Sequence, residues 1–339
     1  MRWFWRPSKL DPDGSRDLSR EAQARLLNHL GINDIQAWTE AWAASGVVHN
    51  TLELWPETAR SDWLWSLGLP LLSEAERHQG QRWLIGLSAL PGCGKTSLGR
   101  WLEAAAEQSG VSLQVVSIDD FYFSAAELEQ SMRGNPWGVP RALPGSHELD
   151  LLNMTLQRWK AGESVRMPVF DKALRQGRGD RSGWRICSSD VLVLEGWFVG
   201  VRPQTMAPTD SRGRQGCALN PPLSSQELAA RRTVQTALAG YIPTWDQLDS
   251  IWQLRATQWN APDIWKRQQE QQMLRERGSG LNRTALDGFI RMITAAIPEA
   301  SFNRIRSDVC FDVDPERRLR QLRVRSGDQD SLSSASATG

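Results

Sequence analysis

The spacing of apolar residues changes near residue 82, and this change divides the chain into two predicted parts. Before it, the segments EAQARLLNHL (21–30), DIQAWTEAWAA (34–44) and RSDWLWSLGL (60–69) place apolar residues three and four positions apart. That spacing is typical of amphipathic helices. We therefore predict a helical N-terminal extension over residues 1–80, in which we find no recognisable chemical motif.

From residue 82 onward, short apolar runs alternate with helical patterns. RWLIGLSA (82–89) is a predicted strand, PGCG (91–94) a glycine-rich turn and KTSLGRWLEAAAEQSG (95–110) a helix that ends at glycine. Further predicted strands are SLQVVSI (112–118), DVLVLE (190–195), SIWQLRA (250–256) and DVCFDVD (308–314). The alternation predicts an α/β fold, with a mostly parallel sheet flanked by helices in a domain over residues 81–325.

Two segments lack this periodicity. Residues 202–225 are rich in Pro, Ser and Gly, so we predict a surface insertion there. Residues 326–339 are polar and contain almost no apolar side chains, so we predict a disordered tail.

The turn ALPGCGKT (89–96) has the spacing of a Walker A phosphate-binding loop, with alanine in place of the first glycine. Glycines let successive backbone N–H groups face a polyphosphate, and the following helix adds its positive N-terminal end. An accidental glycine-rich turn is disfavoured because a strand precedes the motif and a helix follows it. The residues expected around the phosphates of ATP are Gly92, Cys93, Gly94, Lys95, Thr96 and Ser97.

Within this loop, we expect Lys95 to reach the β- and γ-phosphates and to act in catalysis. The Thr96 hydroxyl is expected to bind Mg²⁺, and Ser97 to begin the helix. Cys93 is a small residue that the loop tolerates, although a thiol beside a helix N-terminus and a lysine can also be acidified and redox-sensitive.

Charge and composition exclude several other classes of protein. Forty Lys and Arg against 39 Asp and Glu leave a formal charge of +1, without the global basic field of nucleic-acid binders. The four cysteines form no CxxC pair, so neither a zinc site nor a disulfide framework is indicated. No apolar run reaches the ~18 residues of a membrane span, and the N-terminus becomes charged too soon for a signal peptide. We therefore expect a cytoplasmic protein without nucleic-acid or membrane partners.

Acidic residues follow two of the predicted strands. Asp119 and Asp120 come directly after SLQVVSI, at the strand end where open parallel sheets bind ligands. A kinase of an alcohol uses such a carboxylate to orient the hydroxyl and accept its proton, and Asp119 is our candidate for this base. Asp120 is a candidate for the magnesium shell, or alternatively for capping a turn. Glu195 ends DVLVLE in the position of a Walker B acid, so we expect it to bind Mg²⁺; the alternative is a solvated strand end.

Four segments that follow the phosphate loop resemble D-glycerate 3-kinases of the plant and cyanobacterial type. These kinases belong to a larger group with uridine kinase, phosphoribulokinase and pantothenate kinase. The segments are SIDDFY, PGSHELDLL, MPVFDKALRQGRGDRSGW and VLVLEGWFVGVRP, and the resemblance covers residues 83–318. SIDDFY is shared loosely with the whole group, whereas GSHELDL, FDKALRQGRGDR and EGWFVG are more specific. The resemblance implies transfer of the γ-phosphate of Mg-ATP to the 3-hydroxyl of D-glycerate, giving 3-phosphoglycerate in photorespiratory salvage.

The same resemblance assigns individual residues. Asp119 matches the group's catalytic aspartate, and Glu195 matches the acid of the EG pair. His147 falls where relatives place a substrate-contacting histidine, although the sequence also fits a helix N-terminus capped by Ser146.

A pocket for glycerate needs cations for the carboxylate as well as a base. Lys172, Arg178 and Arg181 are the candidates, with solvated loop charges as the alternative for each. Asp171 is a candidate for orienting one of them or for bonding a substrate hydroxyl.

The segment WKRQQEQQMLRERG (265–278) is a predicted helix that relatives use as a lid over the nucleotide phosphates. Its cations can stabilise charge on a transferring phosphoryl group, and Arg275 is our candidate for this contact. The alternative is an ordinary charged helix face. The four cations are Lys266, Arg267, Arg275 and Arg277.

Two other functions remain open at this point. The first is a kinase of a nucleoside, of pantothenate or of another sugar acid, which a panel of acceptors would distinguish. The second is a non-catalytic ATP-binding switch whose N-terminal helices dock a partner, and turnover without a partner would argue against it.

Overall fold

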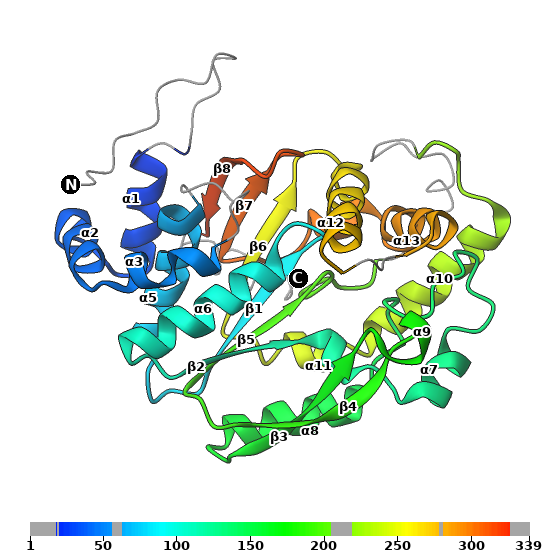
Figure 1. The fold of residues 1–339 in the computed structure, drawn as a ribbon, viewed down its shortest axis with the longest axis horizontal. Helices are drawn as coiled ribbons and strands as arrows, with labels where there is room; N and C mark the ends of the chain where they lie inside the picture. The colour runs from blue at the N-terminus through cyan, green and yellow to red at the C-terminus, as the bar shows by residue number, and fades with distance from the viewer. Residues whose placement is uncertain (1–17, 19, 56–62, 205–218, 278–280, 326–339) are drawn as a thin grey trace, which may run out of the picture.

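The computed structural model describes residues 18, 20–55, 63–204, 219–277 and 281–325. Its central sheet has the strand order β2-β5-β1-β6-β7-β8 (Figure 1). Neighbouring strands from β2 to β7 pair in parallel, and β8 pairs antiparallel with β7. The strands of this sheet are β1 (Trp83–Ala89), β2 (Leu113–Ser117), β5 (Val191–Gly196), β6 (Ser250–Ala256), β7 (Val309–Val313) and β8 (Leu319–Val324). The predicted α/β fold with a mostly parallel sheet is confirmed, and each predicted strand is present.

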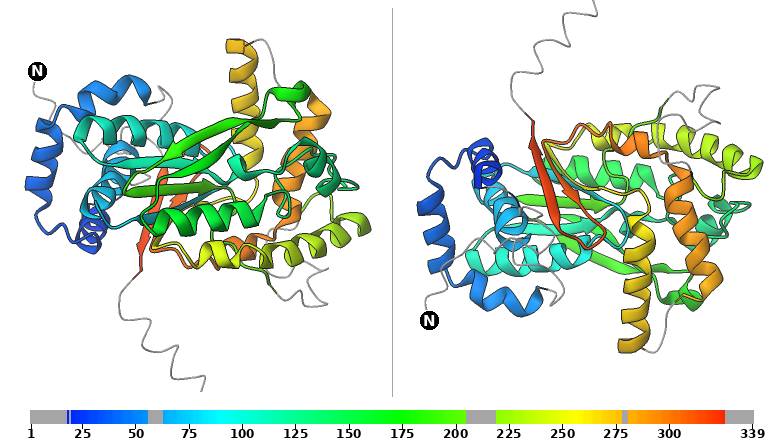
Figure 2. Two further views of the ribbon diagram at one scale, coloured as in Figure 1. Left: turned by 90° about the horizontal axis from the view of Figure 1, so that it is seen from below. Right: turned by 90° about the horizontal axis from the view of Figure 1, so that it is seen from above.

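Helices cover both faces of the sheet, and α6 lies on the opposite side from α8 and α10 (Figure 2). Helix α6 starts after Gly94 and ends at Gly110, which has a left-handed φ of 71°, as the glycine pattern predicted. The longer helices after β1 are α6 (Lys95–Ser109), α8 (Leu149–Lys160), α10 (Ser225–Ala239), α12 (Ala261–Arg277) and α13 (Arg283–Ala296). The shorter ones are η3 (Ile118–Phe121), α7 (Ala125–Ser131), α9 (Leu174–Gly177), α11 (Ile242–Trp245) and α14 (Glu299–Phe302).

A second sheet was not predicted from the sequence. Strands β3 (Val165–Asp171) and β4 (Asp180–Cys187) form an antiparallel hairpin beside the main sheet (Figure 1). Arg185 of β4 donates to the carbonyl of Val115 at 2.5 Å, which ties the hairpin to β2. This hairpin carries the segment between residues 171 and 181 towards the carboxyl ends of the main strands.

Helices precede the first strand, as predicted, and they share the core of the sheet. Glu74 is buried and accepts hydrogen bonds from the indole N–H groups of Trp83 at 3.0 Å and Trp252 at 2.5 Å. Trp101 of α6 donates to the Thr51 hydroxyl at 2.9 Å. The elements before the sheet are α1 (Arg20–His29), α2 (Ile35–Ala44), α3 (Val47–Thr51), η1 (Leu52–Leu54), η2 (Leu64–Gly68) and α5 (Leu69–Arg77).

Some sequence predictions fall outside the described residues, namely residues 205–218 of the expected insertion and the expected tail at 326–339. Among the helices that the structure describes, none is both long and apolar enough to cross a bilayer.

Candidate active site

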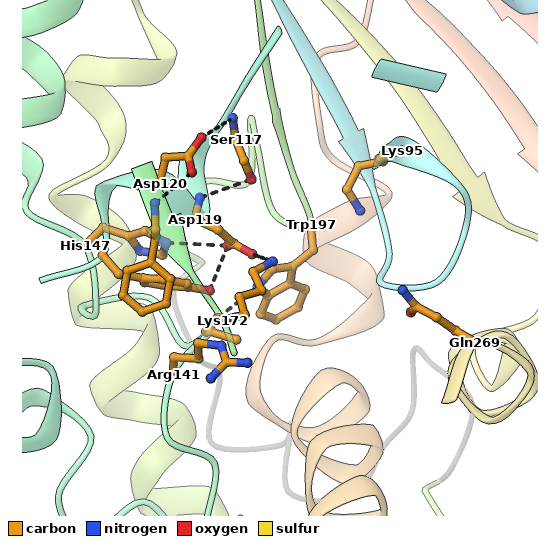
Figure 3. A network of polar contacts seen from close by, with 12 residues as sticks. Lys95, Ser117, Asp119, Asp120, Arg141, His147, Lys172, Trp197 and Gln269 are labelled. Atoms are coloured by element: carbon orange, nitrogen blue, oxygen red, sulfur yellow. Dashed lines mark hydrogen bonds and ion pairs between the residues drawn. The ribbon is translucent and has the colours of Figure 1, made fainter. Parts of the chain in front are cut away.

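The predicted phosphate loop and acidic residues meet at one edge of the main sheet. In the strand register, Glu195 of β5 lies between Leu87 of β1 and Ser117 of β2. The phosphate loop follows β1 and Asp119 follows β2, so both flank Glu195. Figure 3 shows Asp119 on one side of this site and Lys95 on the other. The parallel register therefore brings Glu195 beside groups that lie more than 70 residues before it in the chain.

Glycines shape the phosphate loop as the motif requires. Gly92 and Gly94 have φ values of 83° and 121°, which side-chain-bearing residues rarely adopt. Lys95 begins α6, and its ammonium group donates to the carbonyls of Ala89 at 2.5 Å and Leu90 at 3.4 Å. Burial lowers the pKa of Lys95, while Glu195 opposes that shift. The loop thus holds a lysine beside the helix N-terminus, the arrangement that binds polyphosphate.

Cys93, Thr96 and Ser97 complete the loop. Burial raises the pKa of the Cys93 thiol to about 11, against the lowering influence of Lys95 and Arg317. The interpretation of Cys93 as an acidified, redox-sensitive thiol is therefore wrong, because the buried thiol stays protonated at neutral pH. Thr96 is exposed in the first turn of α6, and Ser97 follows it in the helix rather than beginning it.

Asp119 lies at the centre of the polar contacts in Figure 3. One carboxylate oxygen accepts from the Tyr122 hydroxyl at 2.7 Å, and the other accepts from the Lys172 ammonium at 2.6 Å. Burial raises the pKa of Asp119, but the Lys172 ammonium and His147 outweigh burial and hold that pKa well below its usual range. Asp119 is thus held as an ionised carboxylate by Tyr122 and Lys172.

Asp120 has a different environment from its neighbour. Its two carboxylate oxygens accept the backbone N–H groups of Phe170 at 3.2 Å and Ser117 at 3.4 Å. Ser117 and Asp120 form a capping box at the start of η3. Burial raises the pKa of Asp120. This geometry favours the alternative in which Asp120 caps a turn, because both oxygens accept backbone N–H groups of the turn and the hairpin. The role in the magnesium shell stays a prediction.

Glu195 ends β5 beside the phosphate loop. Burial raises its pKa, and the nearby Lys95 ammonium lowers it. Its carboxylate is close enough to Lys95 and Asp119 for each to affect its ionisation. Glu195 therefore lies at the same edge of the sheet as the phosphate loop and Asp119.

His147 is buried and stacks on the Tyr122 ring, with ring centroids 4.5 Å apart. Its Nδ1 lies 2.7 Å from the Tyr241 hydroxyl, which also accepts the Gly145 N–H at 2.9 Å. Because a buried hydroxyl must donate its own proton, we assign Nδ1 as the acceptor and place the ring proton on Nε2. Burial lowers the pKa of His147, so the ring is neutral at neutral pH.

The protonated Nε2 points towards the site. It lies 3.9 Å from a carboxylate oxygen of Asp119 and has no hydrogen-bond partner within the described residues. A buried donor without a partner is rare in proteins. This position agrees with the expected substrate contact, and Ser146 does not cap a helix, because α8 begins only at Leu149 with Glu148 as its N-cap.

The four predicted substrate residues of the hairpin have different surroundings. Lys172 reaches Asp119, whereas Asp171 is exposed and accepts the Ala173 N–H at 2.8 Å in a local turn. Arg178 is exposed and pairs with Glu129 of α7 at 2.8 Å. Arg181 donates to the Tyr122 carbonyl at 2.8 Å and pairs with Glu148. Lys172 thus contacts Asp119 in the site, and Arg181 contacts the backbone of Tyr122, whose hydroxyl donates to Asp119. Arg178 lies on the surface.

Two further cations lie near the site. Arg141 was not named from the sequence, and Lys266 was considered there only as one of four cations on a predicted helix. Arg141 donates through Nη1 to the carbonyls of Gly177 at 2.7 Å and Arg178 at 2.9 Å. Burial lowers the pKa of Lys266, and the charges of Lys172 and Arg141 add to that effect. Burial and the Arg141 charge also act to lower the pKa of Lys172, but Asp119 outweighs them and raises it. We call Arg141, Lys172 and Lys266 the cation cluster. Arg141 is in no motif, so its position depends on the fold alone.

Helix α12 presents its first turns, and not its end, to the phosphate loop. A Cβ added at Gly92 would lie 2.7 Å from the Cβ of Trp265, and Gln269 extends towards the loop in Figure 3. Arg267 pairs with Asp263 and Asp287. Arg275 is exposed and lies ten residues beyond Trp265, which is about 15 Å along the helix axis. The structure therefore does not bring Arg275 to the loop, and the side chain of Arg277 lies outside the described residues.

Comparisons with known proteins agree with this geometry. A family model described as the phosphoribulokinase/uridine kinase family matches residues 84–207. The uncharacterized kinase mug58 of Schizosaccharomyces pombe is 30% identical over 213 residues, which cover 60% of this chain and 75% of that protein. The chloroplastic D-glycerate 3-kinase of Arabidopsis thaliana is 30% identical over 222 residues, which cover 61% of this chain and 45% of that enzyme.

A solved structure supports the fold independently. The D-glycerate 3-kinase from Cryptococcus neoformans var. grubii matches with a TM-score of 0.61 at 21% identity, covering 76% of this chain and 96% of that one. Similarity of this kind shows the fold alone. The family model and the relative matched over three quarters of its length place the chain in the phosphoribulokinase/uridine kinase family of P-loop small-molecule kinases, which use Mg-ATP.

Proposed function

We propose that this kinase transfers the γ-phosphate of ATP to the 3-hydroxyl of D-glycerate and releases 3-phosphoglycerate. The observation that carries the proposal is an ionised carboxylate, Asp119, held directly against Lys172 of the cation cluster. An alcohol that also bears a carboxylate needs both groups, one for its hydroxyl and the other for its negative charge. Such a reaction would serve photorespiratory glycerate salvage.

The nucleotide half of the reaction uses the phosphate loop. Backbone N–H groups at the start of α6 and the Lys95 ammonium bind the phosphates. The Thr96 hydroxyl and the Glu195 carboxylate are hard oxygen ligands on the same edge of the sheet, and they fit Mg²⁺ that keeps several waters. No cluster of three or more His, Cys, Asp or Glu side chains could hold a metal in the part of the chain that the structure describes. Mg²⁺ bound there would neutralise charge on the β- and γ-phosphates.

The acceptor half uses Asp119 and His147. An acceptor hydroxyl beside Asp119 donates its hydrogen bond to the carboxylate, which orients the oxygen towards the γ-phosphate and takes its proton. The Nε2 proton of His147 is available to a substrate oxygen at the same place. The cation cluster then faces the other end of a three-carbon acid. Arg141 offers a planar guanidinium, a geometry that binds carboxylates through two parallel hydrogen bonds.

Similarity to the Arabidopsis D-glycerate 3-kinase supports this acceptor, although that match covers 45% of the plant enzyme. The family also contains kinases of uncharged acceptors such as uridine. Lys172 pairs with Asp119 and Lys266 pairs with Glu270, whereas the recorded hydrogen bonds of Arg141 go only to backbone carbonyls. A neutral acceptor would leave the Arg141 charge without an anionic partner there, which disfavours it. We therefore choose a small hydroxy acid over a nucleoside.

A panel of acceptors tests the proposal. The purified protein with Mg-ATP is assayed for ADP release with D-glycerate, L-glycerate, glycerol, pantothenate and uridine. We expect kcat/KM to be highest for D-glycerate and at least about 100-fold lower for glycerol, which lacks the carboxylate. A preference for uridine or glycerol would contradict the proposal.

The variant Arg141→Gln, assayed with the same panel, tests whether Arg141 binds the carboxylate of the acceptor. The variant should raise KM for D-glycerate by about tenfold to 100-fold, because it removes a charge-assisted hydrogen bond. KM for ATP should remain within about threefold. Equal losses for D-glycerate and glycerol would mean that Arg141 does not bind the carboxylate.

A further inference from the structure

Arg317 holds the phosphate loop from a distant part of the chain. It lies in the turn between β7 and β8, and its guanidinium donates to the Gly92 carbonyl through Nε at 3.1 Å and Nη2 at 2.9 Å. Its backbone φ is 57°, a left-handed conformation that arginine rarely adopts. Glycine would adopt this conformation without strain, so the turn does not require arginine at this position. We therefore look for the role of Arg317 in the contacts of its side chain.

The same guanidinium also contacts the start of α12. Its Nη1 donates to the side chain of Gln268 at 2.6 Å, and its Cζ lies 5.8 Å from the centroid of the Trp265 ring. Trp265 in turn donates to the Pro315 carbonyl at 2.8 Å and packs against Gly92. Arg317 therefore joins the β7–β8 turn, α12 and the phosphate loop.

The N-terminal segment reaches the loop through Trp63. Its indole N–H donates to the Arg317 carbonyl at 2.7 Å, a contact between residues 254 positions apart. The Trp63 ring also lies 3.7 Å from the position that a Cβ would occupy at Gly94. Trp63 is buried, so this contact is part of the packed core. The segment before the sheet thus touches the loop directly at Gly94 and through Arg317 at Gly92.

We propose that Trp63 and Arg317 are positioning residues, through which the N-terminal segment sets the affinity of the phosphate loop for nucleotide. The two N–H groups on the Gly92 carbonyl fix one peptide of the loop, and the Trp63 indole fixes the backbone from which the guanidinium extends. Fixing the loop before ATP arrives reduces the ordering that binding must supply. This role concerns only the nucleotide, so it does not depend on which acceptor the kinase uses.

The first test compares two tryptophans of the same segment. Trp63→Phe keeps an aromatic ring and removes the N–H that reaches Arg317. Trp38→Phe is the matched control, because the Trp38 indole donates to the Ser73 hydroxyl at 2.9 Å within the N-terminal helices. Titration calorimetry with ADP measures the dissociation constant of each variant, and thermal unfolding measures stability.

We expect Trp63→Phe to raise the dissociation constant for ADP by about threefold to tenfold, the value of one hydrogen bond. KM for the acceptor should stay within about twofold. Trp38→Phe should lower the melting temperature as much as Trp63→Phe does, while its affinity for ADP stays that of the wild type. Unchanged affinity in Trp63→Phe, or an equal loss in both variants, would overturn the proposal.

The second test uses Arg317→Gly and the double variant. Glycine adopts the left-handed φ of residue 317 without strain, so we expect the Arg317→Gly variant to fold. A weaker affinity for ADP in this variant would therefore not result from unfolding. We expect its dissociation constant for ADP to rise by about tenfold or more, because two hydrogen bonds to Gly92 are lost. Adding Trp63→Phe to it should cause little further loss, since both residues act through one contact chain. Fully additive losses would show that Trp63 does not act through Arg317.

Discussion

Replacing Asp119 with asparagine removes a negative charge from the site while keeping the shape of the side chain. The amide oxygen can still accept the Tyr122 hydroxyl, which now lies 2.7 Å from Oδ1. The variant loses the ionic partner of Lys172 and the acceptor for the substrate proton. Lys95 bonds to Ala89 and Leu90 across the site, so its contacts do not involve the replaced group.

The magnitude follows from the environment of Asp119. A positioned base contributes about 10²–10⁴-fold in rate. The pKa of Asp119 is held well below its usual range by Lys172, against the effect of burial, so the carboxylate is a weak base. Transfer of a phosphoryl group also passes through a loose transition state that needs little base strength. We therefore expect kcat to fall by about 100-fold to 1,000-fold, which corresponds to about 2.7–4.1 kcal/mol.

Single-turnover transfer from ATP to D-glycerate measures this step, and a separate titration with ADP measures nucleotide affinity. The affinity should stay within about threefold of the wild type. Asp120→Asn is the matched control, because Asp120 bonds only to backbone N–H groups among its recorded hydrogen bonds, and its kcat should fall far less. Transfer by Asp119→Asn within fivefold of the wild type would refute the assigned role.

Three further outcomes are expected. Tyr241→Phe removes the hydroxyl that donates to Nδ1 of His147 and so fixes its tautomer. In steady-state assays, kcat/KM for the acceptor substrate should fall about fivefold to tenfold, with KM for ATP unchanged. An unchanged kcat/KM for the acceptor substrate would contradict the assigned tautomer. Burial raises the pKa of Glu195, and the proposed magnesium contact requires the ionised carboxylate, so activity should fall as the pH drops through that raised pKa. A pH profile whose acid limb survives in Glu195→Gln would exclude Glu195 as its source. Glu74→Ala removes the acceptor of two buried donors, on Ser250 and Trp252, and of the half-buried Trp83 indole. It should destabilise the fold by about 3 kcal/mol or more in denaturant unfolding, and a loss below about 1 kcal/mol would contradict the value of this network.

Stability should also depend on the charge of Asp119. Its pKa in the folded protein is lower than its ordinary value of 3.8, so the ionised group stabilises the fold at pH values above the ordinary value. That contribution is lost as the pH falls through the lower, folded pKa. Unfolding curves of the wild type and Asp119→Asn should therefore converge in acid, and a constant difference from pH 7 to pH 2 would argue against the ion pair.

Local patterns were sufficient to predict the main sheet and the phosphate loop. The runs at β1 and β5 are almost wholly apolar and are buried along nearly their whole length, which is the pattern of a parallel sheet covered on both faces. The hairpin of β3 and β4 was missed because its strands do not have that pattern. Strand β3 contains Pro168, and β4 alternates half-exposed and exposed positions with a glycine inside it.

The candidate site was predictable only where a residue lies in a motif. Asp119 and Glu195 could be placed because each directly follows or ends an apolar strand. Arg141 lies in no motif and follows no predicted strand. It is held at the site by a hydrogen bond to the carbonyl of Gly177, which lies 36 residues later in the chain. The contact of Trp63 with Arg317 spans 254 residues and leaves no local trace in the sequence. The sequence already favoured Asp119 over Asp120 as the base, and the structure adds that backbone N–H groups contact both carboxylate oxygens of Asp120.

The central claim is tested most directly by incubating the purified protein with Mg-ATP and D-glycerate and identifying the phosphorylated product by phosphorus NMR. We predict one equivalent of 3-phosphoglycerate for each equivalent of ADP, and no ADP above background when D-glycerate is left out. Phosphate on the 2-hydroxyl, or ADP release that does not depend on D-glycerate, would contradict the proposed reaction.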